Sequence, residues 1–336
     1  MQKTVSFTRN SINVFFHILT RCNLRCRHCY INPGQHGQAD LDTETAVDWL
    51  SLFHQSVKKS NLILLGGEPT LHPGLPEIVK AARRIGYDSV TIDTNGYLFN
   101  DILDKVTPAE VDYFSFSLDG ATPETNDRIR GAGCYARCTD GIRKAIARGF
   151  AVSVIYTVSS ENAHELPMMP PLLKELGVRR FFIQVIGIRG RSAEVETLSA
   201  EKPLQLTKTR WEALVPPVAR QAADAGIVTI YPKVFLAPGE TFECAGNVAD
   251  NYFIFPNGRV YRCPLCEDYP LHAMTITSDR LVRTGKINEA DLFTLSIPEG
   301  CVINKLVQGG NIEYGENGAP RYQIACCLLK EEVSPS

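Results

Sequence analysis

The stretch that decides the fold is INVFFHILTRCNLRCRHCY, residues 12–30, in which an apolar run leads directly into three closely spaced cysteines. Its first part, residues 12–19, is rich in β-branched and aromatic residues and predicts a strand. Cys22, Cys26 and Cys29 follow with the spacing C-x3-C-x2-C. Because sites in parallel α/β folds gather at the carboxyl ends of strands, we expect these thiols at the active end of the sheet.

From about residue 12 to residue 225, short apolar strands alternate with helical stretches. Further strands are predicted at 61–65, 88–94, 111–118, 150–158 and 179–187. Helices are predicted at 42–57, 75–86, 138–149, 164–177 and 206–226. Six strand–helix repeats imply a parallel sheet with helices outside, arranged either as a partial barrel or as a doubly wound sheet.

The pattern changes near residue 227. A strand is predicted over 227–235, and 251–263 predicts a hairpin with Asn257-Gly258 as its turn. We therefore expect a core domain, a small cysteine-rich α+β domain and a disordered tail, over 1–226, 227–330 and 331–336 respectively.

Composition narrows the class of protein. The chain has 336 residues, 44% of them hydrophobic and 21% charged, with a net charge of −2. Neither a basic patch for nucleic acid nor an apolar run long enough for a membrane is visible, and the chain is expected in the cytoplasm. The 11 cysteines are an odd number, and cytosolic thiols stay reduced. Clustered cysteines in such a chain point to metal ligands.

The first cysteine cluster offers three thiolates on one short loop. A structural zinc site takes four ligands, so a zinc reading needs His28 or a distant cysteine as the fourth. A [4Fe–4S] cluster also takes four thiolates, and with three of them one iron keeps an open face for an outside ligand. Spacing alone leaves both possibilities open.

C-x3-C-x2-C in a loop after the first strand resembles the hallmark of the radical S-adenosylmethionine (SAM) enzymes, and CNLRCRHCY, 22–30, is similar to members with extra iron–sulfur domains. The resemblance covers roughly 13–225 and implies a partial (β/α)6 TIM-like barrel. It also implies a [4Fe–4S] cluster whose open iron binds SAM. Reductive cleavage of SAM would then give a 5′-deoxyadenosyl radical that takes hydrogen from a substrate.

Further motifs sit where that family binds SAM. LLGGEPTLHP, 64–73, resembles the family's GGEP motif, and two later strand ends carry polar groups. The residues expected to contact SAM are Gly66, Gly67, Glu68, Pro69, Thr94, Asn95, Ser117 and Asp119. Gln184 and Arg189 are expected to face the cavity, with Arg189 able to pair a carboxylate. The alternatives are ordinary turns at the Asn-Gly and Asp-Gly dipeptides and a solvent-facing arginine.

A second cysteine set lies beyond residue 240. Cys244 and Cys263 bracket the predicted hairpin in a pattern that resembles the opening of the SPASM and twitch domains, which hold auxiliary iron–sulfur clusters. The resemblance implies one auxiliary [4Fe–4S] cluster on Cys244, Cys263 and two more cysteines. Cys266 and Cys326 are favoured, with Cys301 and Cys327 as alternatives. A structural zinc site with the same cysteines stays open.

The resemblance implies an enzyme with an electron donor such as flavodoxin or ferredoxin. Relatives with such C-terminal domains mature peptides and proteins or build small cofactors, so the substrate is a peptide, a protein or a cofactor precursor. Neither nucleic acid nor membrane is expected as a partner. The competing hypothesis is a non-catalytic iron–sulfur electron carrier, or a zinc-stabilised binding protein, on the same fold.

Overall fold

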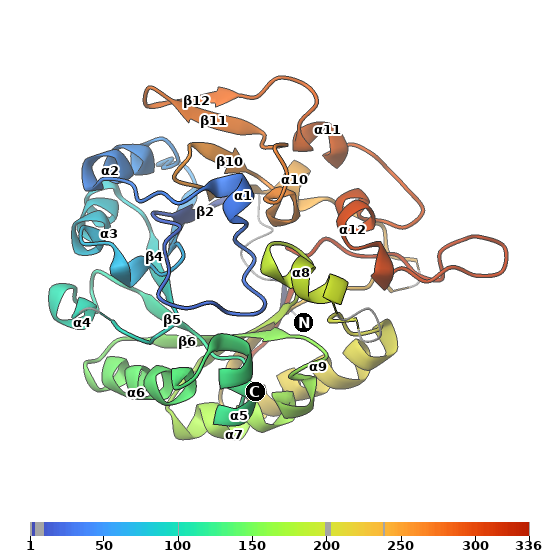
Figure 1. Cartoon of the computed structure of the whole chain (residues 1–336), viewed down its shortest axis with the longest axis horizontal. Coiled ribbons are helices and arrows are strands. Elements are labelled where there is room, and N and C mark those ends of the chain that lie inside the picture. The colour runs from blue at the N-terminus through green and yellow to red at the C-terminus, as the bar shows by residue number, and fades with distance from the viewer. Residues whose placement is uncertain (1, 4–9, 100, 199–202, 238, 336) are drawn as a thin grey trace.

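A computed structural model describes residues 2–3, 10–99, 101–198, 203–237 and 239–335, and these form an open α/β barrel (Figure 1). Its parallel strands are β2 (Ser11–His17), β3 (Lys59–Leu65), β4 (Ser89–Thr94), β5 (Tyr113–Ser117), β6 (Val152–Val158), β7 (Arg180–Val185) and β8 (Val228–Pro232). Consecutive strands are neighbours throughout this run, without the reversal of order that defines a doubly wound sheet. The predicted partial barrel is therefore confirmed.

Helices cover the outside of these strands (Figure 1). The longer ones are α2 (Thr43–Ser51), α3 (Leu75–Ile85), α5 (Pro123–Arg130), α6 (Cys134–Ala147), α7 (Met169–Glu175), α8 (Arg191–Leu198) and α9 (Lys208–Asp224). The shorter ones are α1 (Pro33–His36), α4 (Ile102–Lys105), α10 (Ala245–Val248), α11 (Glu289–Phe293) and α12 (Val302–Val307). Short 3₁₀ turns are η2 (Pro69–Leu71), η3 (Ala163–Met168), η4 (Pro264–Cys266) and η5 (Gly309–Asn311).

Local sequence explains where these helices begin and end. The side chain of Asp42 accepts a hydrogen bond from the Thr45 amide and caps α2. Gly86 ends α3 with a left-handed φ of 107°, which costs glycine no steric penalty. The helix expected over 42–57 is shorter than predicted, because Val57 is 87% exposed and so has no core to pack against.

The two faces of the strands differ in solvent access. In β3, β4 and β7, buried residues alternate with partly accessible ones. Side chains of one parity pack under the helices, whereas those of the other parity line the barrel lumen. Several lumen residues are polar, among them Asp93, Ser115, Thr157 and Gln184. The lumen is therefore a polar space that solvent can reach.

The C-terminal segment adds strands to both edges of this sheet. On one edge, β9 (Asp250–Ile254) runs parallel to β2 and continues into β10 (Arg259–Tyr261), β11 (Met274–Thr277) and β12 (Arg280–Arg283). The predicted hairpin is present, with Gly258 at a φ of 80° between β9 and β10. The domain boundaries expected at 226 and 330 stay a prediction.

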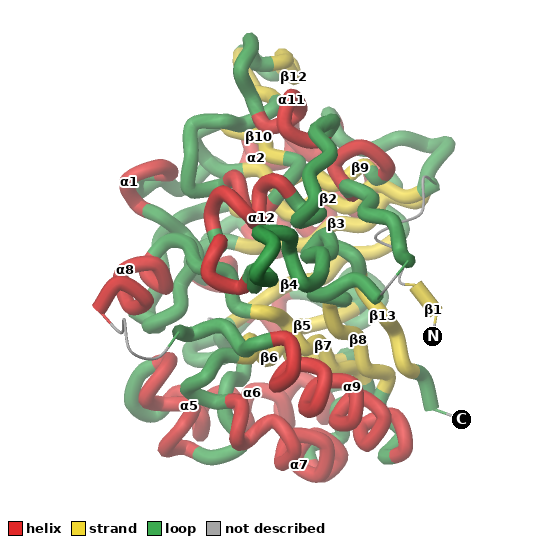
Figure 2. Tube along the Cα trace, turned by 90° about the vertical axis from the view of Figure 1, so that its right-hand side faces the viewer, coloured by secondary structure: helices red, strands yellow, loops and turns green. Residues whose placement is uncertain are grey.

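At the other edge of the sheet, the tail that was expected to be disordered forms part of a strand. Residues 331–333 belong to β13 (Lys330–Val333), which pairs antiparallel with β8. Strand β1 (Gln2–Lys3) pairs with β13 in turn, so the two ends of the described chain meet at this edge (Figure 2). The polar composition of the segment hid a strand that is stabilised by its neighbours on both sides.

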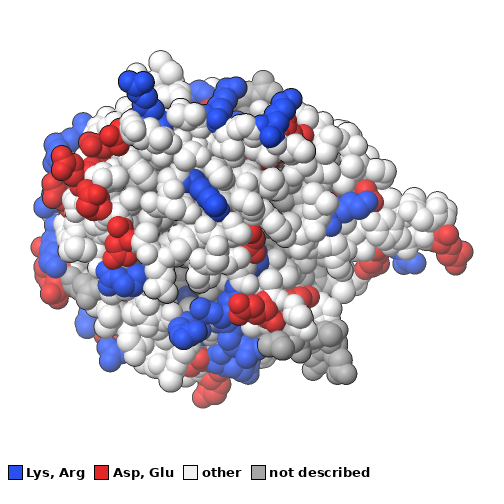
Figure 3. All heavy atoms as spheres, turned by 45° about the horizontal axis from the view of Figure 1, so that its top comes forward, with Lys and Arg blue, Asp and Glu red and all other residues white. Residues whose placement is uncertain are grey.

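Among the described residues, no helix combines the length and apolar character needed to cross a membrane. Basic and acidic side chains are interspersed over the face drawn in Figure 3.

Candidate active site

The first three cysteines lie together on the loop that follows β2. Cys22 is exposed, and Cys26 and Cys29 are partly buried. The Cys22 thiol itself is shielded from water, which raises its pKa to about 12, and the thiols of Cys26 and Cys29 raise it as well. The three side chains are therefore close enough for their charges to interact. Their role as cluster ligands stays a prediction.

Gly66 and Gly67 hold this loop against the end of β3. The amide of Gly67 donates to the Leu19 carbonyl at 3.0 Å, and the amide of Glu68 donates to the Arg21 carbonyl at 3.0 Å. A Cβ atom on Gly67 would lie 2.2 Å from the Arg21 oxygen. The two glycines thus permit a close backbone approach to the cysteine loop, and Pro69 begins η2 directly afterwards.

Glu68 is a buried centre of hydrogen bonds between two strand ends. Its carboxylate accepts from the Thr70 hydroxyl at 2.7 Å, the Thr94 hydroxyl at 2.8 Å and the Asn95 amide at 2.7 Å. Burial raises the pKa of Glu68, whereas these donors act to lower it. With both oxygens engaged, Glu68 ties the end of β3 to the end of β4.

Asn95 extends this network to the cysteine loop. Its Nδ2 donates to Asn23 Oδ1 at 2.9 Å and lies 3.7 Å from Cys22 Sγ. Next to it, Asn23 Nδ2 is buried with no hydrogen-bond partner in the described part of the chain. A buried amide of this kind needs an acceptor, and the carboxylate of a bound amino-acid group would supply one.

Asp119 lies just after β5 and anchors the same loop from the other side. Its Oδ2 is 2.6 Å from His28 Nε2 and 2.6 Å from Arg130 Nε, and its Oδ1 accepts from the Thr157 amide at 2.7 Å. Burial alone would raise the pKa of Asp119, but Arg130 and His28 hold it at about 2. The neighbouring Ser117 ends β5, and its carbonyl faces the Cys138 thiol at 3.6 Å.

A segment after β7 connects the cysteine loop to the C-terminal segment. The Arg191 amide donates to the Cys29 carbonyl at 2.8 Å, and Arg191 Nη1 donates to the Cys26 carbonyl at 2.8 Å. Arg189 forms an ion pair with Glu267 and lies 4.6 Å above the Tyr30 ring. Arg189 thus does pair a carboxylate, but one of this chain, and its side chain is only 17% exposed rather than solvent-facing.

The later cysteines also converge. Burial raises the pKa of Cys301, and Cys326, Cys263 and Cys244 add to that effect. Cys266 and Cys263 share a side-chain hydrogen bond, and Cys301 also acts on Cys266. The buried carboxylate of Glu289 accepts from the Cys263 amide at 3.0 Å and fixes this turn.

Cys301 stands alone in the sequence, far from every other cysteine, so no local spacing indicated that it lies near Cys244, Cys263 and Cys326. His28 and Arg130 were missed as partners of Asp119 for the same reason. Within the described residues, no three His, Cys, Asp or Glu side chains are arranged to hold a single metal ion.

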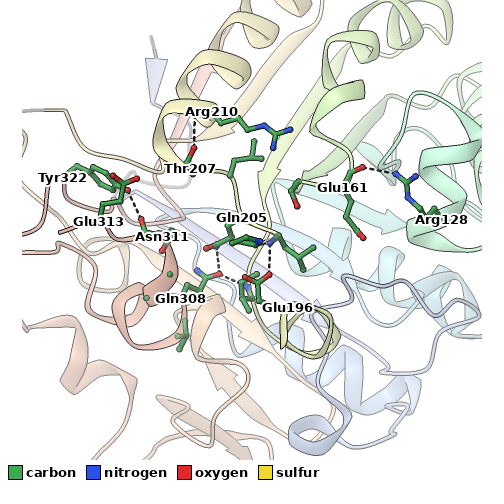
Figure 4. A pocket seen from close by; sticks show the side chains of 18 residues that line it. Arg128, Glu161, Glu196, Gln205, Thr207, Arg210, Gln308, Asn311, Glu313 and Tyr322 are labelled. Atoms are coloured by element: carbon green, nitrogen blue, oxygen red, sulfur yellow. Dashed lines mark hydrogen bonds between the residues drawn. The ribbon is translucent and has the colours of Figure 1, made fainter. Parts of the chain in front are cut away.

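A large cavity opens between the barrel rim and the C-terminal segment, and neither the cysteines nor the predicted SAM contacts are among its lining residues. Its volume is about 1330 Å³, above the 300–1,000 Å³ of ordinary ligand pockets. Figure 4 shows Glu161 on one wall and Tyr322 on the other, with Gln205 and Gln308 between them. Gln205 Nε2 donates to Gln308 Oε1 at 2.9 Å and joins the two parts of the chain.

Comparison with known proteins identifies the family that shares this architecture. Residues 16–169 match the family model of the radical SAM superfamily. The chain is 30% identical over 267 residues to AdoMet-dependent heme synthase of Methanosarcina barkeri, covering 74% of this chain and 76% of that protein. Against Fe-coproporphyrin III synthase of the same organism, identity is 32% over 200 residues, or 57% of this chain and 49% of the relative.

A further relative and a solved structure also match the chain. Pre-heme d1 synthase of Dinoroseobacter shibae is 32% identical over 181 residues, or 53% of this chain and 44% of the relative. The chain thus spans about half the length of these last two synthases. The structure of Streptococcus suis SuiB bound to S-adenosylmethionine superimposes with a TM-score of 0.62 at 15% identity, covering 91% of this chain and 67% of that one.

The chain belongs to the radical SAM superfamily. That is a superfamily of enzymes whose cofactors are a [4Fe–4S] cluster and SAM, so both predicted cofactors and the predicted enzyme class are confirmed. The residues present suit these cofactors: three thiols lie on one short loop, and Asn23 Nδ2, which has no partner in the described part of the chain, lies next to the Asn95 side chain that contacts Cys22.

Proposed function

We propose that the chain is a radical SAM enzyme in which Cys22, Cys26 and Cys29 hold the cluster. When bound, the cluster and SAM supply one-electron cleavage of SAM and abstraction of a hydrogen atom from the substrate. The observation that carries the proposal is the fixed cysteine loop, which is braced by the ends of β3, β4 and β5 and by the segment after β7. A ferredoxin or flavodoxin of the cytoplasm would be the electron donor.

The predicted SAM contacts divide into two groups. Asn95, with its neighbour Asn23, offers amide groups at the cysteine loop and is proposed to bind SAM directly, as are the backbone groups around Gly66 and Gly67. Glu68 and Asp119 already carry several protein partners each. We infer that these two carboxylates act on SAM by positioning the residues that touch it. Pro69, Thr94 and Ser117 stay proposals for the walls of the same pocket.

We also propose one auxiliary [4Fe–4S] cluster in the C-terminal segment, with Cys244, Cys263 and Cys326 as ligands. The fourth ligand is Cys301 or Cys266. The sequence favours Cys266, and the pKa of Cys301 is raised in part by Cys326, Cys263 and Cys244, so both thiols stay candidates for this position. Cys327 neighbours the same group and would stay outside the ligand set.

For the substrate, we propose a small cofactor precursor. Three relatives with 30–32% identity are named as synthases of heme or of related compounds. The cavity of about 1330 Å³ at the barrel rim is large enough for such a molecule. A peptide is the second candidate, because the same cavity is open along the rim and the fold matches SuiB bound to its precursor peptide with a TM-score of 0.58 at 14% identity.

Anaerobic reconstitution with iron and sulfide, followed by dithionite and SAM, tests the reaction. We expect 5′-deoxyadenosine from the parent and none from Cys26→Ala. Cys138→Ala is the control for the loss of a cysteine outside both proposed ligand sets: Cys138 is buried on α6, its thiol faces the Ser117 carbonyl, and its loss should leave the iron content unchanged. A reconstituted parent that carries both clusters and forms no 5′-deoxyadenosine would favour the non-catalytic electron carrier.

A further inference from the structure

Three polar side chains stand at one level of the barrel lumen, two of them on the adjacent strands β6 and β7 and the third on β13, beyond β8. Thr157 of β6 lies directly across from Gln184 of β7 in the parallel register. Lys330 of β13 reaches the same level, because its Nζ donates to Gln184 Oε1 at 2.9 Å. All three lie at the active end of the barrel, close to the carboxyl ends of β6 and β7.

The register of β13 shows that Lys330 points inward. Its neighbour Glu331 pairs with Tyr231 of β8, and the pKa of Tyr231 responds to Arg220 on the outer helix α9. Residue 331 therefore faces outward, and Lys330, of opposite parity, faces the lumen. Since β8 separates β13 from β7, the lysine side chain crosses two strand spacings, about 10 Å, to reach Gln184.

This group presents mainly hydrogen-bond donors. Gln184 Oε1 accepts from Lys330, and the amide NH₂ of Gln184 supplies two further donors. The Lys330 ammonium has three N–H donors, of which Gln184 takes one. Among the residues that the structure describes, no carboxylate pairs with Lys330. The site is thus chemically matched to an acceptor-only group such as a carboxylate.

Solvent access shows that a ligand can approach this group. Lys330, Thr157 and Gln184 each retain partial solvent access. A small anion can therefore reach the ammonium from the lumen.

We propose that Thr157, Gln184 and Lys330 form a carboxylate-binding site in the barrel lumen that anchors an acidic substrate. The inference rests on the proposed function and adds the chemical class of its substrate. It places the anchored end of the substrate beside the turn that carries Cys326 and Cys327. The competing explanation is that Lys330 serves only as a counter-charge to the auxiliary cluster.

Binding of succinate to the reconstituted holoenzyme tests the site without using activity. The apparent unfolding temperature is followed against succinate at constant ionic strength, because a ligand that binds the folded state raises it. The variants are Lys330→Met, Lys330→Arg and Gln184→Leu. Lys233→Met is the matched control, since the Lys233 amide donates to the Leu329 carbonyl at the same edge of the sheet, but its side chain pairs with Glu240 at 2.5 Å.

We expect a saturable rise for the parent, for Lys330→Arg and for Lys233→Met. The apparent affinity for succinate should fall at least tenfold in Lys330→Met and several-fold in Gln184→Leu. A parent that shows no saturable rise, or a Lys330→Met variant that keeps it, would overturn the site. So would a Lys330→Met variant whose sole change is a more negative reduction potential of the auxiliary cluster, which would assign the lysine to that cluster.

The formation of 5′-deoxyadenosine, measured on the same preparations, separates this inference from the proposed function. Succinate binding without SAM cleavage would support the carboxylate site and contradict the proposed radical SAM activity. SAM cleavage without a succinate response would support that activity and contradict the carboxylate site.

Discussion

Replacing Asp119 by Asn should weaken both the fold and the cysteine loop. The change keeps the size of the side chain but removes the negative charge that faces Arg130 and His28 at 2.6 Å each. Asp119 is fully buried, so solvent cannot replace the lost partner. Arg130 would then be a buried cation without its counter-ion, which typically costs 3–5 kcal/mol.

The pKa of Asp119 gives a second value for the free energy that its negative charge contributes to folding. The folded state lowers it from 3.8 to about 2, which corresponds to about 2.4 kcal/mol in favour of the ionised form. Because the folded pKa is lowered, this stabilisation is complete above pH 4 and is lost as the pH falls toward 2. At pH 7, Asp119→Asn should therefore reduce the free energy of unfolding by about 3 kcal/mol.

Urea unfolding of the reconstituted protein measures this change. With a slope of about 3 kcal/mol per molar urea for a chain of this size, the midpoint should fall by about 1 M. Asp104→Asn is the matched control, because Asp104 pairs with Arg148 at the surface and its loss should cost under about 0.5 kcal/mol. Iron should also leave the first cluster faster in Asp119→Asn, since His28 lies between two of its ligands.

A double-mutant cycle tests whether the Asp119–Arg130 ion pair is responsible for the loss of stability. Asp119→Asn combined with Arg130→Met should cost clearly less than the sum of the two single changes. The reasoning would be refuted if the two effects simply added, or if Asp119→Asn unfolded at the parent's urea midpoint.

Three further predictions address the other groups. Cys26→Ala should lose about half of the reconstituted iron and all SAM cleavage, whereas Cys263→Ala should lose the other half and keep some uncoupled cleavage; equal iron in both variants and the parent would contradict this assignment. Glu68→Gln puts an NH₂ group among several donors and should lower the free energy of unfolding by about 2–3 kcal/mol, measured by urea unfolding. Burial raises the pKa of Asp93 from 3.8 to about 7. The protonated side chain therefore favours the folded state at low pH, and this stabilisation of the fold is lost as the pH rises through 7. Asp93→Asn should be more stable than the parent at pH 8 by at most about 4 kcal/mol, and a parent with flat stability from pH 5 to pH 8 would contradict this prediction.

The core of the fold could be predicted because its signals are local. The apolar runs of β2 to β8 and the helices between them have periods that a single sequence displays. The cap at Asp42, the stop at Gly86 and the turn at Gly258 are local chemistry as well, and all three are present. The cysteine loop belongs to the same class, since its three thiols lie within eight residues.

The rest of the site could not be predicted because its partners are distant in sequence. Asp119 was expected to face SAM, yet it meets His28, 91 positions away, and Arg130 on the following helix. Arg189 was expected to face either the cavity or solvent, yet it meets Glu267, 78 positions away. In both cases the residue type indicated a charge that needs a partner, but only the packed fold determines which partner it finds.

The edges of the barrel explain why the C-terminal segment carries its cysteines where it does. An open barrel leaves unpaired backbone groups along β2 and β8, which must be covered. Strand β9 covers β2 and β13 covers β8. Cys244 precedes β9 and Cys326 precedes β13, and the Ala245 amide next to the first cysteine bonds to the thiol of the second. The pairing that protects both edges therefore also brings the ends of the cysteine set together across the opening of the barrel. An auxiliary cluster at that point would join the two edges, so its loss should loosen β13, and with it Lys330, before it affects the first cysteine loop.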